Sequence, residues 1–154
     1  LLNAYIDKKL NELIKQDIKI KVIGNIKSFP KNLKNKITKI EKLTKNNKTI
    51  QINMALNYGS RQEIINALKK IKKKSLSINE KNIGNLLYTK NIPDPEILIR
   101  TGNTNRISNF LMWQIIYTEI FFVKKMWPDF KKKDFSEIIK KYKRIKRNFG
   151  GLNE

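Results

Sequence analysis

Short β-branched segments alternate with amphipathic segments along the chain, and this order constrains the fold more than any other feature. Apolar and β-branched runs predict strands at 19–26, 49–56, 96–100 and 119–123. Apolar residues at helical spacing predict helices at 3–16, from Pro30 to the turn at 45–48, and at 61–72, 79–87, 108–116 and 134–147. Strands that alternate with helices form a parallel sheet flanked by helices, so the predicted fold class is α/β.

The residue types that are missing narrow the chemistry. The chain has 154 residues, which suits one domain, and it contains neither cysteine nor histidine. Disulfides, thiolate or imidazole metal sites, and Cys–His or Ser–His–Asp catalysis are therefore excluded. A metal would need oxygen ligands, which favours magnesium or calcium. No apolar run approaches the roughly 20 residues of a membrane span, and we expect a cytoplasmic location.

The net charge of +21 suggests an anionic partner such as nucleic acid, a membrane surface or a phosphorylated substrate. Compositional drift is the alternative, because lysines are spread along the whole chain. Arginine is more informative, since its planar guanidinium forms paired hydrogen bonds that lysine cannot form. The five arginines are Arg61, Arg100, Arg106, Arg144 and Arg147.

Three predicted strands end in polar or glycine-containing turns, at 24–25, 57–61 and 100–102. Ligands of open parallel sheets bind beyond the carboxyl ends of the strands, and we expect these turns on one edge. The last turn and the residues that follow it contain Arg100, Thr101, Arg106 and Ser108 within nine residues. They lead into the helix predicted at 108–116. Two guanidiniums, a hydroxyl and a helix N-terminus suit a diphosphate. The alternative is that Ser108 only caps the helix and Arg106 is a surface cation.

Two carboxylates are further candidates for a functional site, and a cluster of aromatic residues also needs an interpretation. Glu119 opens an apolar strand, where a charge must be exposed, paired or metal-bound. Asp129 follows Trp127 and Pro128, and in this position an aspartate is more typical of a turn or cap than of a ligand. The aromatic residues between Trp113 and Trp127 are interpreted as core or subunit-interface residues.

Several blocks resemble cis-prenyltransferases of the undecaprenyl diphosphate synthase kind. They are Ile97–Gly102, Arg106–Leu111, Trp113-Gln114, Tyr117, Glu119 and Trp127–Phe130, preceded by Ile23-Gly24, Leu43–Asn47 and Asn57-Tyr58-Gly59 with Arg61 and Ile64, and followed by Phe149-Gly150-Gly151. The matched blocks cover nearly the whole chain in order.

The resemblance implies an enzyme that uses Mg²⁺ to condense isopentenyl diphosphate with an allylic diphosphate, making a polyprenyl diphosphate for the cell-wall lipid carrier. It implies that Arg100, Arg106 and Ser108, with backbone groups near Ile107, hold isopentenyl diphosphate, and that Glu119 is a magnesium-linked carboxylate. It also implies a homodimer with contacts at 113–127, a membrane-associated product, a cytoplasmic enzyme peripheral to the membrane, and no nucleic acid.

The chain departs from the family pattern in two places. Its loop reads Gly102-Asn103-Thr104-Asn105, without the family's usual Gly and Glu. The Asp-Gly-Asn-Gly-Arg-Trp motif, which supplies the catalytic Asp, does not occur. We therefore expect residues 1–154 to be the C-terminal part of a single prenyltransferase domain, with its N-terminal part missing and without activity alone. The alternatives are a non-catalytic partner subunit of a heteromeric prenyltransferase and a basic nucleic-acid-binding module.

Overall fold

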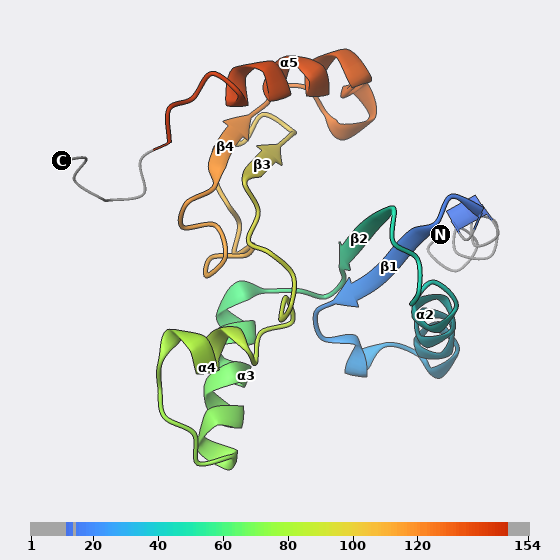
Figure 1. The fold of residues 1–154 in the computed structure, drawn as a ribbon, viewed down its shortest axis with the longest axis vertical. Helices are drawn as coiled ribbons and strands as arrows, with labels where there is room; N and C mark the ends of the chain where they lie inside the picture. Colours follow the sequence, from blue (N-terminus) through green and yellow to red (C-terminus); the bar gives the residue numbers. More distant parts are fainter. Residues whose placement is uncertain (1–11, 14, 148–154) are drawn as a thin grey trace. The chain divides into compact units, whose positions relative to one another are not determined.

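The computed structural model describes residues 12–13 and 15–147. The chain divides into two compact units, Leu1–Lys90 and Asn91–Glu154, each with its own pair of parallel strands (Figure 1). The helix predicted at 3–16 lies mostly outside the described residues, as does the Phe149–Gly151 block.

The first unit is built on strands β1 (Ile18–Ile23) and β2 (Ile50–Ala55). They pair in parallel, with Ile18 opposite Ile50 and Ile23 opposite Ala55. Ile20 and Ile23 of β1 are buried, and their spacing of three residues places them on opposite faces of the strand, whereas most of β2 is exposed. The pairing therefore confirms parallel strands, and β1 is the strand that carries the core of this unit.

Helix α2 (Lys31–Leu43) lies beside the β1/β2 pair and covers the outer edge of β1 (Figure 1). The Ile20 amide donates to Thr44 Oγ1 at 3.1 Å, and the Val22 amide donates to Glu41 Oε1 at 2.8 Å. Thr44 is fully buried and its hydroxyl also donates to the Ile40 carbonyl at 2.8 Å. Side chains at the end of α2 thus satisfy strand amides that a neighbouring strand would otherwise take, which closes this sheet edge.

Helices α3 (Ser60–Lys73) and α4 (Glu80–Gly84) pack against each other. The buried face of α3 repeats every four residues, at Glu63, Ala67 and Ile71, as an amphipathic helix requires. A short 3-10 helix, η1 (Ile26–Ser28), connects β1 to the segment before α2.

The second unit contains β3 (Ile97–Arg100), β4 (Glu119–Phe122), the 3-10 helix η2 (Trp127–Asp129) and α5 (Lys132–Tyr142). Strands β3 and β4 pair in parallel, with Ile97 opposite Glu119. In Figure 1 both strands point toward α5.

The predicted fold class is confirmed: parallel strands are flanked by helices, although β4 follows β3 without an intervening helix among the described residues. Among residues 12–13 and 15–147, however, the strands form two two-stranded sheets instead of one continuous sheet. Most element boundaries lie close to the predicted positions, but α5 ends at Tyr142 and not at 147. Within the described part of the chain, no helix is both long and apolar enough to span a bilayer.

Candidate functional site

Arg100 lies at the carboxyl end of the β3/β4 pair. It is the last residue of β3 and stands opposite Phe122 of β4, so the chain leaves the sheet at Thr101. Polar groups at this end of a parallel pair are where ligands of such sheets bind. The structure therefore places the predicted loop, residues 100–108, at a suitable edge of this unit. We call these residues the diphosphate loop, after the ligand that the sequence analysis predicts for them.

The first half of the diphosphate loop is bound to the segment that follows β4. The Val123 amide donates to the Arg100 carbonyl at 2.8 Å, which extends the ladder beyond the strands. The Gly102 amide donates to the Lys125 carbonyl at 2.8 Å, and the Asn103 amide to the Val123 carbonyl at 3.2 Å. These two amides are thus used inside the protein, and an anion at the loop must be bound by side chains or by later amides.

Gly102 and Asn103 have the backbone conformation that this attachment needs. Their φ values are +92° and +54°, in the left-handed region that glycine and asparagine tolerate best. The missing family glycine at position 103 is therefore replaced by one of the few side chains that accept such a φ.

Arg100 is oriented by a residue that sequence reasoning did not select. Its Nε donates to Thr104 Oγ1 at 3.1 Å, and the Arg100 side chain is half-buried. This bond uses Nε. The two terminal nitrogens of a guanidinium are the donors that suit phosphate oxygens, and this bond does not use them. Thr104 is one of the departures from the family pattern, and here it fixes the guanidinium from within the loop.

The second half of the loop differs from the prediction. Arg106 and Ser108 are exposed, and Ile107 is half-buried. The helix predicted at 108–116 is wrong: Ser108, Asn109 and Leu111 have φ values of +54°, +60° and +46°, and turns follow them. Ser108 consequently caps no helix, and residues 108–116 offer no helix N-terminus to this loop. Side chains and loop amides are the only anion-binding groups that it offers.

The failure of this helix has a physical reason. A helix of nine residues is marginal in water unless its apolar face is buried by its neighbours. Here Ile115 is buried, but Met112, Ile116 and Tyr117 are 45%, 70% and 63% exposed, so this burial is incomplete. Isolated turns remain, such as the bond from the Gln114 amide to the Leu111 carbonyl at 3.0 Å.

Glu119 lies at the other end of the strand pair from Arg100. It is the first residue of β4, half-buried, and its amide donates to the Glu96 carbonyl at 3.0 Å. Its register partner is Ile97, three residues before Arg100, which corresponds to about 10 Å along the strand at 3.3 Å per residue. Within the described ranges, no three carboxylates gather as a metal site. Among the described residues, Glu119 therefore belongs to no cluster of three or more metal-ligating groups.

The two other predicted turns share one edge of the β1/β2 sheet. The Asn25 amide donates to the Asn57 carbonyl at 3.1 Å, and Asn57 Nδ2 donates to the Asn25 carbonyl at 2.9 Å. Gly24 has φ +117°, and a Cβ there would lie 2.1 Å from the Leu56 carbonyl oxygen. This close approach shows that the two turns pack against each other, and the two hydrogen bonds between Asn25 and Asn57 join them.

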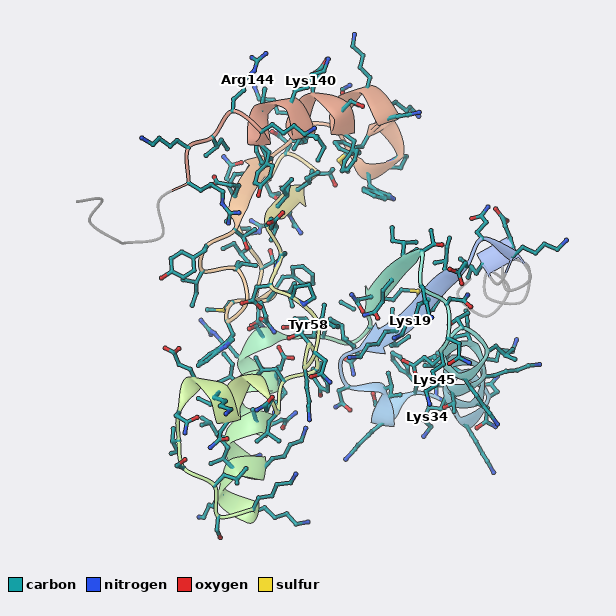
Figure 2. All side chains as sticks on the ribbon, viewed as in Figure 1. Lys19, Lys34, Lys45, Tyr58, Lys140 and Arg144 are labelled. Atoms are coloured by element: carbon teal, nitrogen blue, oxygen red, sulfur yellow. The ribbon has the colours of Figure 1, made fainter. Side chains whose placement is uncertain are left out.

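Positive side chains extend from both units, from Lys34 and Lys45 to Lys140 and Arg144 (Figure 2). This distribution agrees with the spread of lysines in the sequence. The charge therefore gives a general attraction for anions, and it does not by itself mark a site.

Comparison with known proteins decides the family. The chain matches the prenyltransferase family described as undecaprenyl diphosphate synthase over residues 1–150. The chain belongs to this family.

Relatives within this prenyltransferase family agree. The chain is 45% identical over 151 residues to an isoprenyl transferase of Rickettsia felis, and 42% identical over 159 residues to one of Clostridium tetani. These alignments cover 97% and 99% of this chain but 64% and 62% of the relatives. The chain thus spans slightly less than two thirds of the length of these curated proteins.

Solved structures show the same fold. A probable undecaprenyl diphosphate synthase from Campylobacter jejuni matches with a TM-score of 0.89 and 35% identity, covering 97% of this chain and 71% of that one. Lavandulyl diphosphate synthase from Lavandula x intermedia, solved with dimethylallyl diphosphate, matches with a TM-score of 0.88 and 31% identity, covering 96% and 67%. The expected prenyltransferase fold is confirmed.

Proposed function

We propose that this chain carries the isopentenyl diphosphate-binding part of a cis-prenyltransferase that makes a polyprenyl diphosphate, a lipid-carrier precursor. The observation that carries the proposal is the diphosphate loop at the carboxyl end of β3, in a chain that belongs to the undecaprenyl diphosphate synthase family. Relatives bear the name isoprenyl transferase, which fits the same reaction class. The second substrate in this proposal is an allylic diphosphate.

The proposed roles follow from the chemistry of the loop. Arg100, held at Nε by Thr104, offers its terminal nitrogens to phosphate oxygens, and the exposed Arg106 adds a second fork. Ser108 adds a hydroxyl, and the amide of Ile107 is a further donor. In this proposal these donors bind the diphosphate and orient the homoallylic double bond of the substrate.

Magnesium fits this proposal through Glu119. Magnesium is usually held by one or two carboxylates together with substrate phosphates, so one glutamate is a chemically suitable but incomplete donor set. When bound, the ion would offset the negative charge of a diphosphate group. Water supplies the other ligands in this proposal, because Glu119 lies about 10 Å along the strand pair from Arg100 and the diphosphate expected there.

Substrate binding tests the proposal. Titration of isopentenyl diphosphate into the 154-residue chain should show binding that falls at least tenfold in Arg100→Ala and in Arg106→Ala, because charge-assisted hydrogen bonds are lost. Arg144→Ala is the matched control, since Arg144 is an exposed arginine beyond the end of α5 and the change in charge is the same. Equal losses in all three variants would mean general electrostatic attraction and would reject the site. Salt-sensitive DNA binding without isopentenyl diphosphate binding would favour the nucleic-acid alternative.

We also propose that a homodimer forms through the predicted 113–127 stretch together with the three residues before it, which we call the 110–127 segment. Large apolar side chains are exposed there, namely Phe110, Met112, Ile116, Tyr117, Phe122, Met126 and Trp127. An exposed apolar surface of this kind usually marks an interaction site. The proposed enzyme works in the cytoplasm and contacts the membrane through its lipid product. Flotation of the protein with lipid vesicles measures this membrane association.

A further inference from the structure

The diphosphate loop depends on the segment that leaves β4. The Gly102 amide bonds to the Lys125 carbonyl at 2.8 Å, and the Asn103 amide bonds to the Val123 carbonyl at 3.2 Å. The position of the loop backbone is thus set by residues 20 and 23 positions later in the sequence. Whatever fixes Lys125 also fixes Gly102.

Lys125 is fixed by one carboxylate of α5. Its Nζ forms an ion pair with Asp134 Oδ1 at 2.6 Å, and Asp134 Oδ2 accepts the Lys131 amide at 2.8 Å. The side chain of Asp134 is 18% exposed and that of Lys125 is 52% exposed. One carboxylate therefore caps the N-terminus of α5 and holds the β4 exit at the same time.

The charges around this pair keep it ionised. The hydrogen bond from Lys125 lowers the pKa of Asp134, helped by the amide of Lys131, and the same bond raises the pKa of Lys125. The positive charge of Lys133 also lowers the pKa of Asp134. The negative charges of Glu137 and Asp129 also raise the pKa of Lys125. Both partners are consequently charged at neutral pH.

We propose that Lys125 and Asp134 are positioning residues for the diphosphate loop. This inference rests on the proposed function of that loop. Neither residue needs to touch the diphosphate: Asp134 holds Lys125, and the Lys125 carbonyl holds Gly102. The ion pair thereby connects α5 to the geometry of Arg100 and the residues that follow it.

Long-range attraction and positioning predict opposite signs for one variant. Asp134→Asn removes a negative charge and makes the chain more positive. If general attraction set the affinity, inorganic pyrophosphate would bind more tightly. If the ion pair positions the loop, pyrophosphate binds more weakly even though the chain has become more positive.

The experiment uses the full chain with two measurements. Pyrophosphate affinity is determined by calorimetry, and exchange of the Gly102 and Asn103 amides with solvent is followed by NMR. In Asp134→Asn and Lys125→Met we expect affinity to fall about fivefold and exchange to speed up by a similar factor, as for the loss of a well-formed exposed ion pair. Lys124→Met is the matched control, because it removes the same charge one residue away. Lys125→Arg keeps the pair and should retain the parent values.

Each outcome decides the matter. Weaker binding with faster exchange in both variants, and near-parent values in the two controls, supports the positioning role. Tighter binding in Asp134→Asn, or unchanged exchange in both variants, overturns it. A lower melting temperature without a change in exchange or affinity also overturns it, since the pair would then only stabilise α5. Faster exchange in a chain whose parent form binds no pyrophosphate rejects the proposed function and leaves the positioning of the loop intact.

Discussion

Substitution of Glu63 tests how strongly one buried carboxylate holds the first unit together. Its side chain is only 2% exposed on α3. Oε2 accepts the Tyr58 hydroxyl at 2.5 Å, and Oε1 accepts the Tyr88 amide at 2.6 Å. The carboxylate therefore joins the turn after β2 to the segment after α4. The Tyr58 and Tyr88 rings also meet edge to face, with centroids 6.3 Å apart.

The expected loss follows from these two bonds. A hydrogen bond to a charged group contributes about 1.5–3 kcal/mol, and a buried donor without a partner costs a comparable amount. Glu63→Gln keeps one acceptor oxygen but replaces the other with a donor, so we expect a loss of about 2 kcal/mol. Glu63→Ala removes both acceptors and leaves a cavity, so we expect about 4 kcal/mol. Tyr58→Phe removes one hydroxyl, so we expect about 1.5 kcal/mol.

Urea unfolding followed by far-ultraviolet circular dichroism measures these losses. Gln62→Ala is the control, because Gln62 is an exposed neighbour on α3 and should change stability by less than about 0.5 kcal/mol. In the double variant of Glu63→Gln and Tyr58→Phe the losses should not add, since both changes alter the same contact between positions 58 and 63. Additive losses, or a Glu63→Gln protein as stable as the control, would refute the reasoning.

Two further predictions concern backbone space and assembly. Gly24→Ala should cost about 3 kcal/mol or more, because its Cβ would lie 2.1 Å from the Leu56 oxygen at a φ of +117°. Gly84→Ala meets open space in a helix and should gain up to about 1 kcal/mol, and equal urea midpoints for the two variants would contradict this. Ile116→Lys should convert the proposed dimer to a monomer in sedimentation experiments, whereas Ile78→Lys, changed at a similarly exposed isoleucine outside the 110–127 segment, should not. Parallel shifts in both variants would argue against that interface.

Local patterns were sufficient for most helices and strands. The alternating run at 19–26 predicts β1, which is observed at Ile18–Ile23, and the apolar stripe after Pro30 predicts α2, observed at Lys31–Leu43. The spacing of apolar side chains along these segments already contains the information, because it selects the face that each element buries. Boundaries shifted by a few residues where a side-chain cap or turn decided the end.

The candidate site was predicted only in part. Arg100 and Gly102 were found from their place after a strand, and the structure locates both at the carboxyl end of β3. Thr104 was seen only as a departure from the family pattern, and the ion pair of Lys125 with Asp134 was missed. No rule of residue spacing identifies Lys125, because its polar side chain looks like that of any surface lysine and its contact with Gly102 is made by its backbone carbonyl.

The sequence by itself determined the α/β class, the family, the absence of thiol and imidazole chemistry, and the cationic residues offered to a diphosphate. Tertiary structure alone decided that 108–116 forms turns, that the Gly102 and Asn103 amides are already bonded, and that Glu119 pairs in register with Ile97 and not with Arg100. The reason is range. Propensity and periodicity act between neighbours in the chain, whereas burial and strand register depend on residues that are far apart in sequence and meet only after folding.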